Sequence, residues 1–95
     1  MNNENDWKDG DLLASDYADN LILVYKCIIW DYYHDIFEAY IGVQENSVTE
    51  VKSEWTIKLW RKANKEETKK FYKWLAKNNK VWDSKNKKLL EVKRM

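Results

Sequence analysis

The spacing of hydrophobic residues along the chain changes once, close to residue 64. Before that point, apolar residues form short runs or alternate with polar ones, as in "LILVYKCIIW" at 21–30 and "IFEAYIGV" at 36–43. Segments of this length that are rich in β-branched and aromatic residues are typical of strands. After that point, apolar residues recur every three or four positions, which is typical of a helix. The pattern predicts a sheet followed by a helix.

Four segments before residue 64 are predicted to be strands. They are residues 12–15, 21–30, 36–43 and 55–60. Gly10 is expected to supply a turn ahead of the first strand. Polar segments separate the strands, and the longest of these, 44–54, has room for a short strand near 48–51.

Two of these segments alternate in a way that predicts which side chains share a face, because neighbouring residues of a strand point to opposite faces. In 36–43 the residues on one face are Phe37, Ala39, Ile41 and Val43. In 55–60 they are Trp55, Ile57 and Leu59. The segment 55–60 is therefore predicted to be a half-buried strand.

One amphipathic helix is predicted over residues 65–77. Asn64 followed three positions later by Glu67 resembles a capping box, in which each residue's side chain binds the other's backbone N–H. At about 100° per residue, one side of the helix is apolar. Its members are Thr68, Phe71, Trp74 and Leu75. The helix is expected to end near Asn78 and Asn79, because Asn tolerates the left-handed backbone conformation that ends helices.

A hairpin is predicted after the helix, from "KVW" at 80–82 through the turn "DSKNK" to "KLLEV" at 88–92. This order of elements predicts an α+β fold, in which one amphipathic helix packs on a small curved antiparallel sheet. Residues 10–95 are expected to form this single domain. Residues 1–9 are polar and are expected to be a disordered tail, with Trp7 as the only anchor.

Charge is distributed unevenly between the two parts of the chain. Residues 1–60 carry four Lys and twelve Asp or Glu, a net charge of −8, whereas residues 61–95 carry thirteen Lys or Arg and four acids, a net charge of +9. Such an asymmetry indicates a basic face for an acidic partner. The alternative is that the two parts neutralise each other within the fold.

Most of the basic residues belong to the predicted helix and to the residues that flank it. The candidates for a binding surface are Lys62, Lys65, Lys69, Lys70, Lys73, Lys77 and Lys80. They could contact phosphates along one helix face, and Tyr72 at the edge of that face could stack on a base. An acidic protein surface would suit the same lysines. The alternative is an ordinary solvated helix face, although such a face more often alternates charges of opposite sign.

Aromatic side chains supply a second candidate surface. The chain holds six Trp, six Tyr and two Phe, more than a small core can hide. Four of them crowd the segment 30–40, namely Trp30, Tyr32, Tyr33 and Tyr40. Exposed Trp and Tyr are typical anchors of binding patches. The alternative is an aromatic core whose polar tips reach water.

Catalytic and metal-binding motifs are not found in the sequence. His34 is the only histidine, and its spacing from Cys27 and the acids matches no known zinc motif. Cys27 lies beside Ile28 and Ile29, where a buried and inert thiol is expected. Two glycines are too few for a glycine-rich phosphate loop. We expect a protein that is not an enzyme and needs no metal or cofactor.

The cellular location is also constrained. One cysteine cannot form an internal disulfide, which fits a reducing compartment. No apolar run approaches the roughly 20 residues of a membrane span, and the acidic start of the chain is unlike a secretory signal. The protein is expected to be cytoplasmic and to have no membrane partner.

Two stretches resemble a family of small phage and prophage proteins. "KDGDLLASDYADNLILVYK" is similar to the opening of these proteins, in which a Lys-Asp-Gly-Asp turn leads into a hairpin. "RKANKEETKKFYKWLAKNNKVWD" is similar to their ending, with Arg61, Ala63, Glu66, Glu67, Trp82 and Asp83 in the matching places. Asn64 stands where the family usually has Thr, and Asn79 stands where it usually has Gly.

The resemblance implies a small accessory protein of a bacterial virus or integrated element. Such proteins often bind and disable host machinery, and anti-CRISPR inhibitors are among them. The expected function is inhibition of a host defence complex by direct binding, with a CRISPR ribonucleoprotein as the first candidate target. The alternative is a small RNA- or DNA-binding protein that uses the basic helix face.

Overall fold

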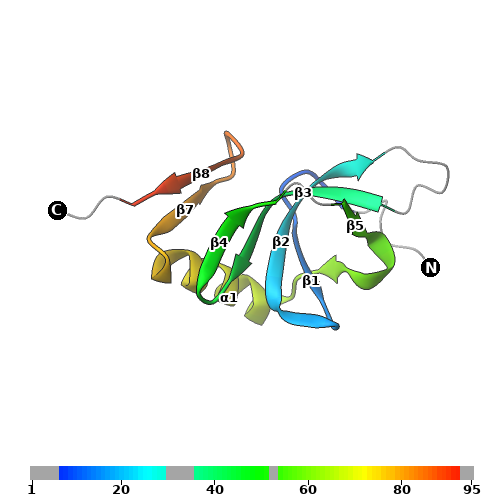
Figure 1. Cartoon of the computed structure of the whole chain (residues 1–95), viewed down its shortest axis with the longest axis horizontal. Helices are drawn as coiled ribbons and strands as arrows, with labels where there is room; N and C mark the ends of the chain where they lie inside the picture. Colours follow the sequence, from blue (N-terminus) through cyan, green and yellow to red (C-terminus); the bar gives the residue numbers. More distant parts are fainter. Residues whose placement is uncertain (1–6, 30–35, 52–53, 93–95) are drawn as a thin grey trace.

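The structure is a computed structural model, and it describes residues 7–29, 36–51 and 54–92 (Figure 1). It confirms the predicted α+β architecture, with an antiparallel sheet, one helix and a separate C-terminal hairpin. The strands are β1 (Leu12–Ser15), β2 (Ala18–Ile29), β3 (Ile36–Gln44), β4 (Ser47–Glu50), β5 (Glu54–Thr56), β6 (Arg61–Lys62), β7 (Lys80–Asp83) and β8 (Lys88–Glu91). The helix is α1 (Lys65–Lys77), and a 3-10 turn, η2, covers Ile57–Leu59.

The main sheet has the strand order β4-β3-β2-β1-β6, and all of its pairs are antiparallel. From β1 to β4 each strand pairs with the next one along the chain, so short connections suffice. The second edge of β3 holds two short strands in succession. β4 pairs with Ile41–Gln44, and β5 pairs with Ile36–Glu38.

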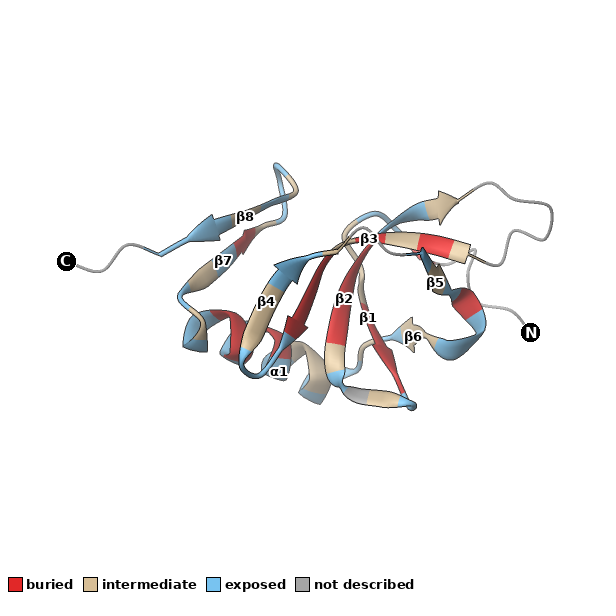
Figure 2. Cartoon of the chain, in the orientation of Figure 1, coloured by how far each residue is buried: buried red, intermediate tan, exposed pale blue. Residues whose placement is uncertain are grey.

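Buried residues concentrate in the central strands of the main sheet, β1, β2 and β3 (Figure 2), and they form two clusters. Within β2, Ile22 and Val24 belong to the same cluster as the apolar side of α1, whereas their neighbours Leu23 and Tyr25 belong to a different cluster. Successive strand residues point to opposite faces, so the two clusters lie on opposite sides of the sheet. The helix cluster comprises Ile22, Val24, Ile41, Val43, Phe71, Trp74, Leu75 and Trp82. The Trp7 cluster comprises Trp7, Leu13, Leu23, Tyr25, Phe37, Ala39 and Ile57.

The four alternating residues of β3 are all buried, but the prediction that they share one face is wrong. Ile41 and Val43 belong to the helix cluster, whereas Phe37 and Ala39 belong to the Trp7 cluster. The reason is a shift in the β2–β3 register, which places two residues of β3, Tyr40 and Ile41, opposite the single Val24 of β2. A β-bulge of this kind moves the side chains beyond it to the other face of the strand.

Helix α1 begins and ends where the sequence predicts. The Asn64 side chain accepts a hydrogen bond from the Glu67 N–H at 2.8 Å, and the Glu67 carboxylate accepts one from the Asn64 N–H at 2.9 Å, which completes the capping box. At the other end, Asn79 adopts the left-handed conformation with φ 59°. The predicted apolar side is buried through Phe71, Trp74 and Leu75.

The prediction of one strand over 55–60 is wrong. β5 ends at Thr56, and η2 then turns the chain before β6 begins. Thr56 pairs with Ile36, the first residue of β3, so the edge of β3 offers no further described residue to pair with. The turn also buries Ile57 in the Trp7 cluster, while Leu59 remains 46% exposed. Packing on the far face of the sheet therefore overrides the local alternation.

Trp7, the predicted anchor of the N-terminal segment, is part of the core. Its side chain is only 7% exposed, and its ring lies edge-on to the rings of Tyr25 and Phe37, each at 5.4 Å. Gly10 forms the predicted turn with φ 97°, a conformation that suits glycine. The Gly10 N–H donates to the Tyr25 carbonyl at 2.8 Å and so holds this turn on β2. Residues 1–6 of the predicted tail lie outside the described residues.

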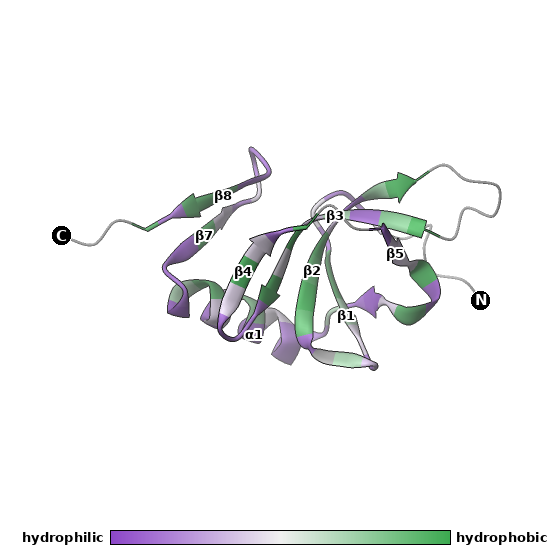
Figure 3. Cartoon of the chain, in the orientation of Figure 1, coloured by the Kyte–Doolittle hydropathy of each residue, from purple (hydrophilic) through white to green (hydrophobic). Residues whose placement is uncertain are grey.

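The C-terminal hairpin forms a two-stranded sheet of its own. Its inner side carries Trp82, which is 8% exposed and joins the helix cluster. The Trp82 ring lies 5.6 Å from the ring of Tyr40, so the hairpin also contacts the main sheet at the bulge in β3. The hydropathy colouring shows mixed polar and apolar positions on this hairpin, in contrast to the apolar centre of β2 (Figure 3).

Candidate binding surface on helix α1

Five lysines occupy the solvent side of α1. All five are exposed, and they are Lys65, Lys69, Lys70, Lys73 and Lys77. The opposite side of the helix is fixed on the sheet by Phe71 and Leu75, which are 0% and 2% exposed. The helix therefore presents its lysines from a rigid support.

Ion pairs divide the seven predicted basic residues into two groups. Lys62 lies 3.8 Å from the carboxylate of Asp11, Lys77 lies 3.1 Å from Glu45, and Lys80 lies 2.7 Å from Glu91. The other four lysines form no ion pair with any residue that the structure describes. These four, with Tyr72, are called the lysine face below: Lys65, Lys69, Lys70, Lys73 and Tyr72.

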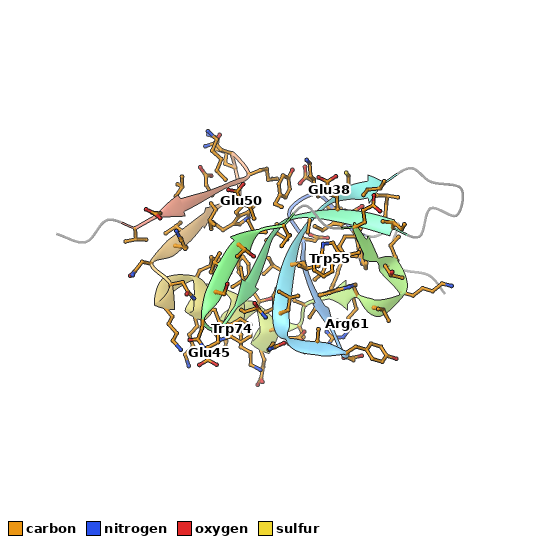
Figure 4. All side chains as sticks on the ribbon, in the orientation of Figure 1. Glu38, Glu45, Glu50, Trp55, Arg61 and Trp74 are labelled. Atoms are coloured by element: carbon orange, nitrogen blue, oxygen red, sulfur yellow. The ribbon has the colours of Figure 1, made fainter. Side chains whose placement is uncertain are left out.

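Acidic residues mark both ends of the lysine face. At the C-terminal end of α1, Glu45 in the β3–β4 turn pairs with Lys77, and its carbonyl accepts a hydrogen bond from the Asn78 side chain at 3.1 Å (Figure 4). At the N-terminal end, Asp11 and Asp16 lie beside Lys62 and Arg61. Between these ends, Lys65 to Lys73 covers a helical rise of about 12 Å. The lysines that form no direct ion pair are thus confined to a short segment.

Tyr72 is the aromatic member of the lysine face. It is 56% exposed, and its ring stands edge-on to Phe71 with the ring centres 5.0 Å apart. Helical spacing places Tyr72 beside Lys65 and Lys69 around the helix axis. It can therefore contact the same partner as these lysines.

Arg61 has a structural role beside the lysine face. Its guanidinium binds both carboxylate oxygens of Glu67, at 2.7 and 2.9 Å, and also binds Asp16 at 2.8 Å (Figure 4). The hydrogen bonds from Arg61 lower the pKa of Glu67, and the same contacts raise the pKa of Arg61. A bidentate pair of this geometry is a strong charge-assisted interaction. It ties the start of α1 to the β1–β2 turn.

The predicted aromatic patch is only partly described. Trp30, Tyr32 and Tyr33 lie outside the described residues, so their proposed role stays a prediction. Tyr40 is half-buried and packs against Trp82. Burial, together with a hydrogen bond to Asp9, raises the pKa of Tyr40 to about 12. Tyr40 therefore serves the contact between the hairpin and the main sheet.

The groups considered for catalysis or metal binding can be located in part. Cys27 is exposed on β2, so the expectation of a buried thiol is wrong. The register shift between Tyr25 and Cys27 accounts for this difference, because it places Cys27 opposite Glu38 and not opposite a buried residue of β3. His34 lies outside the described residues. Among the residues that are described, no three His, Cys, Asp or Glu side chains come together as they would to hold a metal.

One hollow lies where the hairpin meets the main sheet. It has a volume of about 280 Å³ and is lined by Tyr40, Ile41, Glu50, Trp82, Lys87, Lys88 and Leu89. Its polar groups are one carboxylate and two ammonium groups, together with the rims of two aromatic rings. None of these lining residues is a Ser, Cys or His, so the hollow holds none of the usual pairs of nucleophile and base.

One exposed apolar surface was missed by the sequence reasoning. Val81 and Leu90 of the hairpin are 46% and 44% exposed, and Val92 is 41% exposed. The alternation of "KVWD" and "KLLE" carried the signal, because only one of two neighbouring apolar residues in a strand can point inward. Trp82 and Leu89 take the inward positions, which leaves Val81 and Leu90 outside.

Comparisons with known proteins add no further assignment. No protein-family model, no curated protein and no solved structure matches the chain. Among the described residues, no helix is both long enough and apolar enough to cross a membrane. The described residues form a small α+β fold with one α-helix and a separate hairpin. Its function has to be argued from its own surface.

Proposed function

We propose that the protein is a non-enzymatic binding protein that recognises an acidic partner surface through the lysine face. One observation carries this proposal. Lys65, Lys69, Lys70 and Lys73 are exposed on a helix whose other side is locked into the core, and none of them pairs with a described acid. Rigid presentation of like charges lowers the entropy that a partner must remove on binding.

The spacing of the lysines supports an anionic partner. Lys65 and Lys69 are four residues apart on the helix, as are Lys69 and Lys73. Like charges at this spacing destabilise a helix by roughly 0.2–0.5 kcal/mol per pair. A solvated helix usually avoids this cost by alternating acids and bases. A partner that brings carboxylates or phosphates would remove the repulsion.

The limits of the lysine face favour a protein surface or a protein–RNA complex over free nucleic acid. The unpaired lysines extend over about 12 Å of helix, and grooves that bind single strands track several nucleotides. A strand that continued beyond α1 would approach Glu45 at one end and Asp11 at the other. Because both carboxylates already pair with Lys77 and Lys62, the ends of α1 would offer a continuing strand little further attraction.

The resemblance to phage and prophage proteins supports a host defence complex in the cytoplasm as the target. Within that class, we rank a CRISPR nuclease ribonucleoprotein first, so that the protein would act as an anti-CRISPR inhibitor. Such a complex offers both acidic protein surface and RNA. The aromatic residues Trp30, Tyr32 and Tyr33 remain candidates for a second contact with it.

Charge reversal of the lysine face tests this function directly. We expect Lys65→Glu, Lys69→Glu and Lys73→Glu, combined in one variant, to abolish binding to the target complex. A matched control reverses Lys8, Lys58 and Lys85, which are exposed, lie outside α1 and change the net charge equally. The measurement is target-DNA cleavage by a panel of reconstituted CRISPR nucleases, with each protein added in excess. Inhibition by the wild type and the control but not by the α1 variant is the expected result.

Retention of inhibition by the α1 variant would show that the lysine face is not the binding site. Failure of the wild type to inhibit any nuclease in the panel would remove the CRISPR target from the proposal. The alternative function is then decided by a gel-shift of single-stranded RNA and duplex DNA at physiological salt. Direct phosphate contacts to a single strand would give a log–log salt slope of about −0.7 per contact. We expect no shift at sub-micromolar protein.

A further inference from the structure

We propose that a second copy of this chain docks on β8, so that the two C-terminal hairpins form one four-stranded antiparallel sheet. The proposal is independent of the lysine face, because it uses residues 80–92 and not α1. It rests on an exposed apolar pair, on an open strand edge and on the register that these two features allow together.

The apolar pair lies on the outer side of the hairpin. Val81 and Leu90 are directly opposite each other on β7 and β8, and both are nearly half exposed. Val92 is exposed as well and follows Leu90 on the same side of the chain by alternation. A two-stranded hairpin with such a pair in water is marginally stable by itself. Two further strands would cover the pair.

The open edge belongs to β8, which pairs only with β7 in the part of the chain that the structure describes. The Val92 N–H donates to the Asn79 carbonyl at 2.8 Å, which shows that the backbone of Val92 faces β7. In an antiparallel pair, alternate residues face the partner strand. The backbone groups of Leu90 therefore also face β7, whereas those of Leu89 and Glu91 point to the open edge.

These orientations allow a symmetric register for two copies that is centred on Leu90. Registers shifted by two residues would use the same outward backbone groups, but the one centred on Leu90 brings the two exposed Leu90 side chains together. A two-fold axis at Leu90 places Leu89 opposite Glu91 of the second copy, and Glu91 opposite its Leu89. Both pairs can then exchange N–H···O=C hydrogen bonds through the outward groups. The two Leu90 side chains meet at the axis and are flanked by the two Val81 side chains. A slip by one residue would turn each Leu90 side chain to the wrong face.

Charge predicts how salt affects this contact. Residues 80–91 carry Lys80, Lys85, Lys87 and Lys88 against Asp83 and Glu91, so two hairpins repel each other. Added salt screens this repulsion and should strengthen the dimer. Binding through the lysine face should weaken under the same conditions. Because the interface is small, we expect a weak and transient dimer.

Proline at residue 91 provides the sharpest test. The Glu91 N–H points to the open edge, so Glu91→Pro removes a hydrogen bond of the dimer but none between β7 and β8. Glu91→Ala is the matched control, because it loses the same carboxylate and the same ion pair with Lys80 but keeps the N–H. We expect sedimentation velocity at increasing protein concentration to show a dimer for the wild type and Glu91→Ala, and a monomer for Glu91→Pro.

A wild type that remains monomeric up to about 1 mM would overturn the proposal, because a dimer with a dissociation constant of about 1 mM or less would be visible at that concentration. Equal dimerisation of Glu91→Pro and Glu91→Ala would overturn it as well. Leu90→Thr keeps the strand preference and removes the apolar contact, so it replaces the proline variant if circular dichroism shows that the latter is unfolded. Hydrogen exchange gives an independent readout. The amides of Leu89 and Glu91 should become protected as protein concentration rises, and unchanged exchange would contradict the register.

Discussion

The two faces of the main sheet are closed in different ways. On one face, α1 contributes Phe71, Trp74 and Leu75 from a single regular element that starts with a capping box. On the other face, closure comes from separate segments, with Trp7 ahead of β1 and Ile57 in η2. Trp55 and Trp60 cover these residues from the outside of the same cluster. The first face is closed by local structure, and the second by side chains that are distant in sequence.

This difference affects how well the buried polar groups are satisfied. The indole N–H groups of Trp7, Trp55 and Trp82 are buried and donate to no described residue. Two of the three belong to the Trp7 side of the sheet. An unpaired buried donor costs roughly 1–3 kcal/mol, which offsets part of the gain from burying the ring. We therefore expect the helix side to be the more stable of the two.

The largest effect is predicted for Phe71→Ala on the helix side. Phe71 is 0% exposed, and its loss should cost about 3–5 kcal/mol of unfolding free energy. A chain of this length has roughly 5–14 kcal/mol in total, so much of the stability would disappear. Urea unfolding followed by far-ultraviolet circular dichroism measures the change. A loss below 1 kcal/mol would contradict the assignment of Phe71 to the core.

A smaller effect is predicted for Trp7→Ala on the other face. The side chain lies near the start of the described chain, where the remaining structure can relax, so we expect a loss of about 2–3 kcal/mol. Hydrogen exchange should rise for the amides around Tyr25 and Phe37, while α1 stays protected. Equal exchange on both faces would mean that they unfold as one unit, and the distinction between them would fail.

The same difference explains what could be predicted from the sequence. The limits of α1 follow from Asn64, Glu67 and Asn79, all of which act on neighbouring residues. Burial of Trp7 does not follow from its neighbours, because it depends on Tyr25 and Phe37 across the sheet. The bulge in β3 and the turn η2 are likewise set by packing between distant segments. Local sequence patterns therefore predicted the structure correctly only where a single regular element, α1, covers the core.

The candidate surface follows the same rule. The lysines of α1 could be assigned to one exposed face, because helical spacing alone decides it. Their division into paired and unpaired residues could not be predicted, since Glu45 and Asp11 reach them from other elements. The sequence predicts Tyr40 in an exposed patch. Its contact with Trp82 could not be predicted, because the two residues lie far apart in the chain. Exposure of Val81 and Leu90 was predictable from alternation.

An intermediate effect is predicted for the ion pair between Arg61 and Glu67, which ties α1 to the β1–β2 turn. The folded-state pKa of Glu67 is lowered by Arg61, so the stabilisation is complete above the unfolded pKa and is lost as the pH falls through the folded one. Glu67→Gln keeps a hydrogen-bond acceptor for the cap and removes the charge. We expect a loss of about 1 kcal/mol at pH 7 and a clearly smaller loss near pH 2. A variant that is equally destabilised at both pH values would show that the charge is not the cause.

The smallest effect on stability is predicted for the outer side of α1. Combining Lys65→Glu, Lys69→Glu and Lys73→Glu changes only exposed side chains, which usually shift stability by less than about 0.5 kcal/mol each. Repulsion along the face is similar before and after reversal, and a carboxylate at residue 65 favours the helix dipole. We therefore expect the free energy of unfolding, measured with urea, to be the same for this variant and the wild type within about 0.5 kcal/mol. A loss above 1 kcal/mol would mean that these lysines stabilise the fold. In that case the lysine face would help to hold α1 on the sheet. A loss of binding by the same variant could then result from unfolding and would not show a direct contact with the partner.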